Sequence, residues 1–175
     1  MADVTGKGYI YGLRDLKVTN LAGTTQVDLP ASQTLTWEPQ FIGDSLRGDD
    51  TTVASIGQLD KIEWNLSHGG ISLEALAIMT GKTVTTSGTT PNRTEKMTFK
   101  AGDNMPYFKL YGRAIGDAGD GLHVIIKKAK VTSMAGGLED QTWLVSELGG
   151  EAVGDAAGDI YEIIKLETDT NLPTT

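Results

Sequence analysis

Two segments of this sequence alternate strictly between polar and apolar side chains, and they constrain the fold more than any other feature. The apolar positions are Leu35, Trp37 and Phe41 in the first segment and Ile62, Trp64 and Leu66 in the second. A period of two places successive side chains on opposite faces of a β-strand. Each segment therefore predicts a strand with one buried and one water-facing side. Pro39 lacks a backbone N–H, so it predicts a bulge or an unpaired stretch in the first strand.

The connection between these two strands, residues 42–52, is much longer than a tight hairpin turn requires. Long connections within compact domains are usually either functional or disordered. We therefore expect a long β-hairpin loop here. Its charged residues, Asp44, Arg47, Asp49 and Asp50, are candidates for contacts with a partner.

The remaining sequence predicts short strands and one helix. Strands are indicated over residues 14–19, 27–29, 82–86, 94–100, 106–115, 122–134, 142–148 and 160–167. A helix is expected at about residues 72–80, because Ser72 suits the N-cap and Gly81 suits the C′ position. This order predicts a mainly β, antiparallel β-sandwich or barrel with one short flanking α-helix. We expect a single domain over residues 1–175, with flexible ends at 1–8 and 169–175.

The composition excludes several classes of protein. The 175 residues contain no cysteine, which removes disulfides and thiolate metal sites. The net charge of −8 disfavours a protein that grips nucleic acid, because that affinity comes from cations on phosphates. No apolar run approaches the length of a membrane helix and no signal peptide is evident, so we expect no membrane partner and folding in a cytoplasm.

Catalytic and metal-binding patterns are also missing from the sequence. Its two histidines, His68 and His123, have no second histidine at ligand spacing. The acidic, glycine-rich segments 116–121 and 154–159 lack the ligand spacing of a calcium loop and are interpreted as turns. We expect no enzymatic activity, no cofactor and no metal. A serine triad with members dispersed along the chain stays possible at this stage.

Three lysines, Lys127, Lys128 and Lys130, form a basic cluster in an otherwise acidic chain. One interpretation is an edge strand on which lysine blocks unwanted pairing. The other is a contact between subunits, where the cluster receives acidic residues such as Asp49 and Asp50 of a neighbouring copy. The sequence favours neither.

Taken together, these segments resemble the major tail protein, or tail tube protein, of long non-contractile-tailed bacteriophages (siphophages). The resemblance extends from about Tyr11 to Glu167. Its segments are GLRDLKVTN (12–20), VDLPASQTL (27–35), LRGDD (46–50), GGISLEA (69–75), SGTTPNR (87–93), PYFK (106–109) and VII (124–126).

The resemblance implies a structural subunit that forms hexameric rings stacked into a tail tube. Such a tube conducts DNA during ejection without binding it specifically, and it contacts the tape measure protein and the tail-end proteins. The protein would be part of the virion and would be assembled in the host cytoplasm. The polar face of the two alternating strands is then the candidate lumen lining: Thr34, Thr36, Glu38, Gln40, Lys61, Glu63 and Asn65. The segment 42–52 becomes the candidate contact between rings.

Two other functions remain open. A β-sandwich binding module for carbohydrate or a cell surface would need an exposed aromatic platform. Since Trp37, Trp64 and Trp143 fall on alternating strands, we expect them to be buried instead. A hydrolase with dispersed catalytic residues would depend on His68 or His123.

Overall fold

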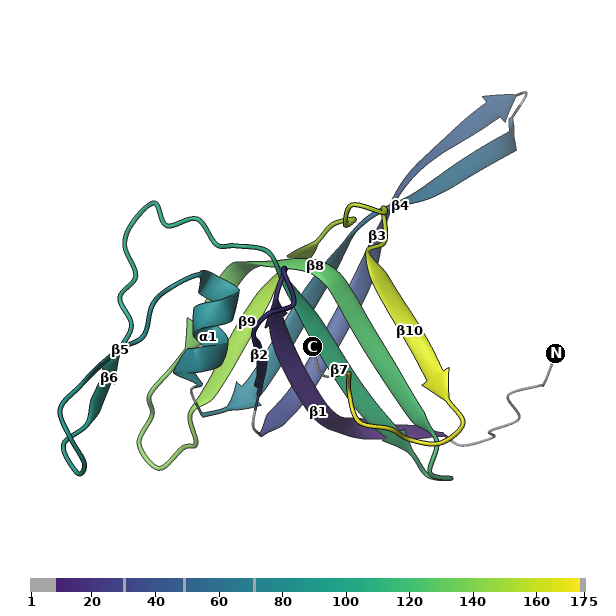
Figure 1. The fold of residues 1–175 in the computed structure, drawn as a ribbon. Coiled ribbons are helices and arrows are strands. Elements are labelled where there is room, and N and C mark those ends of the chain that lie inside the picture. The colour runs from purple at the N-terminus through teal and green to yellow at the C-terminus, as the bar shows by residue number, and fades with distance from the viewer. Residues whose placement is uncertain (1–8, 30, 49, 71, 174–175) are drawn as a thin grey trace.

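The structure is a computed structural model that describes residues 9–29, 31–48, 50–70 and 72–173. Ten strands and one helix follow the predicted order along the chain (Figure 1). Their bounds are β1 (Ile10–Asn20), β2 (Gln26–Asp28), β3 (Ser32–Gly48), β4 (Thr51–Gly69), α1 (Leu73–Thr80), β5 (Thr85–Ser87), β6 (Thr94–Lys96), β7 (Phe108–Gly116), β8 (Gly121–Gly136), β9 (Val145–Ala152) and β10 (Tyr161–Leu166). The predicted flexible segment 1–8 lies outside the described residues.

Eight of the strands form one antiparallel sheet in the order β2-β1-β7-β8-β9-β4-β3, and β10 pairs with β8 beside this path. Strand β8 is long enough to hold two strands along the same edge. Its first half, Gly121–Ile126, pairs with β10, and its second half, Ala129–Gly136, pairs with β9. The sheet therefore forks at the middle of β8. Strands β5 and β6 form a separate two-stranded sheet.

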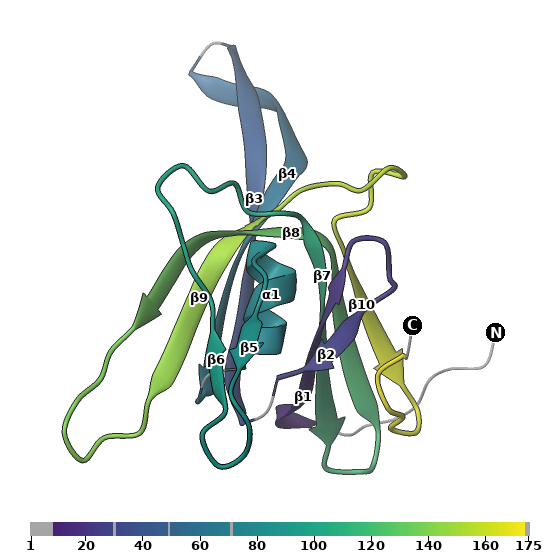
Figure 2. The ribbon, with the colours of Figure 1, turned by 60° about the vertical axis from the view of Figure 1, so that its left-hand side comes forward.

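The large sheet curls until its two sides face each other across a shared core. Leu35 of β3 reaches Gly112 of β7, where a Cβ would lie 2.7 Å from the leucine Cδ2. Trp64 and Phe108 meet edge to face, with ring centroids 5.6 Å apart. Figure 2 shows α1 lying between the two sides of the curl. The strands β2 and β3 end the sheet without pairing to each other, so the arrangement is sandwich-like, as predicted, and not a closed barrel.

The helix forms where its capping residues predict it. The Ser72 hydroxyl accepts a hydrogen bond from the Ala75 N–H at 3.3 Å, and Gly81 ends the helix in the left-handed region at φ 69°. Met79 and Ala75 are fully buried against the sheet. Among the described residues, no helix is long and apolar enough to cross a membrane.

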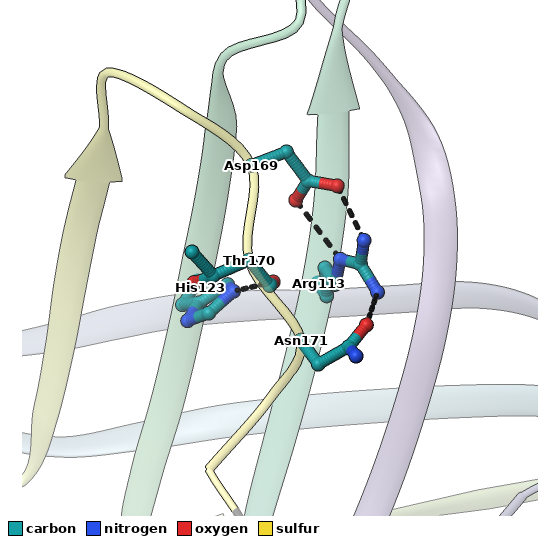
Figure 3. A network of polar contacts seen from close by, with 5 residues as sticks. All are labelled: Arg113, His123, Asp169, Thr170 and Asn171. Atoms are coloured by element: carbon teal, nitrogen blue, oxygen red, sulfur yellow. Dashed lines mark hydrogen bonds and ion pairs between the residues drawn. The ribbon is translucent and has the colours of Figure 1, made fainter.

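Residues 169–172, which fall in the segment predicted to be flexible, contact β7 and β8, and Figure 3 shows Asp169, Thr170 and Asn171 beside these strands. The Arg113 guanidinium binds both carboxylate oxygens of Asp169 and donates a third hydrogen bond to Asn171 at 2.8 Å. This contact holds the pKa of Asp169 below its ordinary value. His123 Nε2 lies 3.0 Å from the carbonyl oxygen of Thr170.

An apolar contact completes this attachment. Leu172 is 2% exposed and packs on Tyr111 and Ile125, on the side of the sheet opposite the main core. The amide of Gln26 then binds the carbonyl oxygen of Pro173 at 3.0 Å. One buried leucine and one ion pair attach this part of the polar segment to the sheet, and its flexibility stays a prediction.

His68 is an ionisable residue on the core side of β4. It is fully buried, and neither ring nitrogen has a hydrogen-bond partner among the described residues. Removal from water disfavours the imidazolium, so burial lowers the pKa of His68. The unfolded chain, whose histidines titrate near pH 6.5, then binds a proton that the folded chain excludes.

We expect the free energy of unfolding to fall as the pH drops below about 6.5, by at most about 1.4 kcal/mol per pH unit from this residue. Urea denaturation of the wild type and of the His68→Leu variant, at pH 7.5 and at pH 5.5, measures this loss of stability. Both pH values lie about one unit from the unfolded pKa. The variant should lose less stability than the wild type over that range. Equal losses in both proteins would contradict the role given to His68.

Candidate functional site

The hairpin of β3 and β4 projects from the body as a two-stranded arm (Figures 1 and 2). We define the arm as residues 41–58. The predicted long loop at 42–52 is wrong, because β3 continues to Gly48 and β4 begins at Thr51. Every side chain that the structure describes in the arm is exposed. Side chains alternate between the two faces of the arm, but neither face packs on a core. The sequence there therefore does not show the polar–apolar pattern that reveals a strand.

A β-bulge marks the place where the arm leaves the body. Gln40 pairs with Lys61 and Phe41 pairs with Leu59, which leaves Asp60 as an extra residue in β4. Such a bulge bends its strand and increases the local twist. Pro39 itself pairs in register with Ile62 on the edge strand β3, so the irregularity lies just beyond the proline that predicted it.

The two faces of the arm differ in chemistry. Directly paired residues share a face, so Gly43 with Gly57 and Ser45 with Ser55 form a face of small side chains. The other face carries the pairs Ile42 with Gln58, Asp44 with Ile56 and Leu46 with Ala54. Its three large apolar side chains are exposed by 64% (Ile42), 66% (Leu46) and 67% (Ile56).

No other described part of the chain packs on this apolar face. An isolated two-stranded hairpin is at best marginally stable in water. Contiguous exposed apolar side chains on a soluble domain usually mark a contact with another molecule. Phe41, which we expected to be buried beside Leu35 and Trp37, is 67% exposed because the chain has already left the body at that point.

The charged candidates of this segment are placed on the arm where the structure describes them. Asp44, Arg47 and Asp50 are exposed, and Asp49 lies outside the described residues. The Asp44 carboxylate accepts a hydrogen bond from the Ser45 N–H. Their proposed role in contacts between rings stays a prediction.

The seven candidate lumen residues lie together on the outer face of β3 and β4. Cross-strand pairs join Thr34 with Ser67, Thr36 with Asn65, Glu38 with Glu63 and Gln40 with Lys61. The residues that alternate with them along β4, namely Ile62, Trp64 and Leu66, point to the inner side and belong to the core. The common face is a finding, and its role as a lumen lining stays a prediction.

Glutamates form a row across this face. Glu38 is directly opposite Glu63, which is directly opposite Glu151 on β9. Lys61 lies beside this row: its Nζ lies 2.5 Å from Glu151 and 3.8 Å from Glu63. The hydrogen bond to Glu151 raises the pKa of Lys61. Lys130 of β8 is directly opposite Glu151, so two lysines accompany three carboxylates and the row keeps a net charge of −1.

The three lysines of the basic cluster have partners in their own chain. Lys127 pairs with Glu162 of β10 at 2.7 Å. Lys128 and Lys130 lie over the Tyr107 ring, with Nζ 4.8 and 5.4 Å from its centroid. A register shift where Leu110 pairs with Ile126 and Phe108 pairs with Ala129 places a bulge at Lys127 and Lys128. A contact with a neighbouring copy stays a prediction for this cluster.

Two of the open strand edges are long enough to pair with a further strand, and the short strand β2 also ends the sheet. Strand β3 ends the sheet over 17 residues, and the edge of β10 that faces away from β8 has no strand partner among the described residues. Their unpaired N–H and C=O groups can pair with another chain.

Sequence reasoning placed Trp143 in a strand over residues 142–148, but it lies in the loop between β8 and β9, residues 137–144. Trp143 is 93% exposed and Leu138 is 89% exposed, whereas we expected Trp143 to be buried. Trp64 is fully buried, as predicted, and Trp37 packs partly buried against the core. The glycine pair Gly136 and Gly137 was the available signal for a loop here.

The histidines do not join a polar cluster that resembles a catalytic site. His68 is enclosed in the core without a polar partner, and His123 contacts the backbone of Thr170. Over residues 9–29, 31–48, 50–70 and 72–173, no group of three or more acidic, histidine or cysteine side chains could hold a metal ion.

No protein-family model matches this sequence, and no curated protein matches it. Among solved structures, the chain is similar to a chain of the anti-feeding prophage cap, the AFP tube terminating cap, determined by cryo-EM. The match covers 94% of this chain and 99% of that chain, with 14% sequence identity and a TM-score of 0.49. We draw no conclusion about the function of this chain from a similarity at that level.

The glutamate row should cost stability in the isolated subunit. Like charges directly opposite on neighbouring strands repel, so Glu38→Gln should raise the free energy of unfolding by about 0.5 kcal/mol at low salt. High salt should reduce the gain, because it screens exposed charges. Urea denaturation at two salt concentrations measures both effects. Glu139→Gln, in the loop 137–144, is the matched control and should gain nothing; a loss of stability in Glu38→Gln would contradict the repulsion.

Proposed function

We propose that this protein is a structural subunit that assembles with copies of itself. The observation that carries the proposal is the arm, which exposes Ile42, Leu46 and Ile56 on one face and has no cover within the described chain. Burying these side chains against another copy gains the hydrophobic free energy that the single subunit cannot gain.

The shape of the subunit favours repeated assembly. The arm and the open edge of β3 belong to one side of the sheet, and the open edge of β10 belongs to the other branch of the fork. A contact between two different patches is heterologous, and it generates closed rings or open filaments depending on the rotation between copies. Both outcomes use the same surfaces on every copy.

In its finer form, the proposal is a phage tail tube. The sequence resemblance to siphophage tail tube proteins supports hexameric rings, stacked into a tube that forms a conduit for DNA. With the glutamate row facing the lumen, DNA would be repelled from the wall and would pass without specific binding. The partners would be further copies, the tape measure protein and tail-end proteins, in a virion assembled in the host cytoplasm. The role needs no catalysis, cofactor or metal.

Acidic substitutions on the apolar face of the arm test the proposal. Ile42→Asp combined with Ile56→Asp should give a folded monomer that no longer forms rings or tubes, because the buried interface would then hold unpaired charges. Negative-stain electron microscopy and analytical ultracentrifugation of concentrated protein measure the outcome. Circular dichroism checks that both proteins fold.

Leu21→Asp, an apolar-to-acidic change at a partly exposed position outside the arm, is the matched control and should keep assembly. Normal tubes from the double arm variant would remove the arm from the mechanism. A wild-type protein that stays monomeric at every concentration and salt condition would count against self-assembly itself.

The exposure of Trp143 favours a second candidate, a binding module for carbohydrate or a cell surface. A single aromatic side chain in a loop can stack on a sugar ring, although it is not the broad platform such modules need. The binding module predicts retention of monomeric protein on insoluble polysaccharide, lost in the Trp143→Ala variant. Retention that does not depend on Trp143 would remove the observation that favours it.

A further inference from the structure

An apolar groove lies at the end of the body opposite the arm. It runs between α1, the segment 95–99 and the end of the β8–β9 hairpin, with a cavity volume of about 470 Å³. Its apolar lining comes from Leu73, Leu76, Met97, Phe99, Met134 and Leu148. Phe99 is 43% exposed and Met134 is 49% exposed, so the groove is open to a ligand without any rearrangement of the core.

Strand β4 separates the groove from the arm of the same copy. Ile56 is in the arm, and His68, near the other end of β4, pairs with Ser146, which lines the groove. These two β4 residues are 12 positions apart, or about 40 Å at about 3.3 Å per residue. The arm projects away from the body (Figure 1), so it cannot fold back into its own groove. A second copy placed end to end brings its arm to this groove.

The groove and the arm are complementary in apolar chemistry. The arm presents isoleucine and leucine side chains from one face of a narrow two-stranded ribbon. The groove presents two methionines, Met97 and Met134, whose flexible side chains adapt to the shape of an apolar partner.

The segment on one side of the groove also carries a charge opposite to that of the arm, whereas the loop 137–144 contains Glu139 and Asp140. Residues 41–58 contain three aspartates and one arginine, a net charge of −2. Residues 93–100, of which Glu95, Lys96, Met97 and Phe99 line the groove, contain three basic residues and one glutamate, a net charge of +2 in a chain of net charge −8. Arg93 and Glu95 pair with each other at 3.0 Å, and the carboxylate of Asp103 lies near Lys100, so Lys96 is the cation of this segment that lines the groove.

The loop 137–144 stands at the mouth of the groove. Gly136 and Ser146, at the two ends of this loop, both line the groove. The exposed side chains of Leu138 and Trp143 in the loop can therefore cover an occupant and exclude water from it.

We propose that the groove receives the arm of a second copy, with Ile42, Leu46 and Ile56 against the methionines and Asp44 and Asp50 toward Lys96 and Lys100. The inference rests on the self-assembly proposed above and names the receiving surface. It makes the contact head-to-tail, since the arm at one end of each copy meets the groove at the other end of the next.

Disulfide trapping tests this pairing directly, because the chain has no cysteine of its own. One preparation carries Ile56→Cys in the arm and the other carries Met134→Cys in the groove. The two are mixed under assembly conditions and oxidised, and dimers are counted on non-reducing gels. A disulfide needs Cβ atoms within about 4.5 Å, so only docked copies react. We expect at least tenfold more mixed dimer than with the control Asn65→Cys on the outer face.

A charge exchange gives an independent measurement. Lys96→Glu with Lys100→Glu should reduce assembly at low salt, and Asp44→Lys with Asp50→Lys in the other copy should restore it. Tubes that form normally, while the arm cysteine fails to react with either Met134→Cys or Phe99→Cys, would overturn the groove and leave self-assembly standing. Wild-type protein that never assembles would overturn self-assembly and the groove together.

Discussion

The rest of the structure depends on the packing of Trp64 of β4 against Phe108 of β7. Two large aromatic side chains in edge-to-face contact, 5.6 Å apart, bring two distant strands of one curled sheet into a shared core. Because side chains alternate along β4, the same contact directs Glu63 and Asn65 outward. The acidic outer face and the apolar core are therefore two consequences of one strand orientation.

Strand β4 also links the core to the arm. Its C-terminal part is buried between β9 and β3, and its N-terminal part extends into solvent with β3 as its one neighbour among the described strands. The bulge at Asp60 separates these parts and lets the arm take a direction of its own. A strand held firmly at one end can present an exposed apolar ribbon at the other without unfolding, which the proposed self-assembly requires.

Most of the fold could be predicted from residue patterns. Period-two alternation located the strand pair around Trp37 and Trp64, and the caps Ser72 and Gly81 located the helix within one residue of its bounds. Part of the candidate site followed from the same alternation, since the seven polar residues of β3 and β4 share a face. The arm was mistaken for a loop and Trp143 for a buried residue, because local patterns report which side chains alternate and not whether anything lies against them.

The sequence alone determined the order of the strands along the chain, the ends of the helix and the two faces of each strand. These features depend on side-chain periodicity and capping, which are local. Only the tertiary structure decided what is covered. It showed that Leu172 packs on the outer side of the sheet, that Ile42 and Ile56 remain in water, and that a groove lies at the far end of β4. Burial depends on contacts between residues far apart in the chain, and no pattern within a single segment contains them.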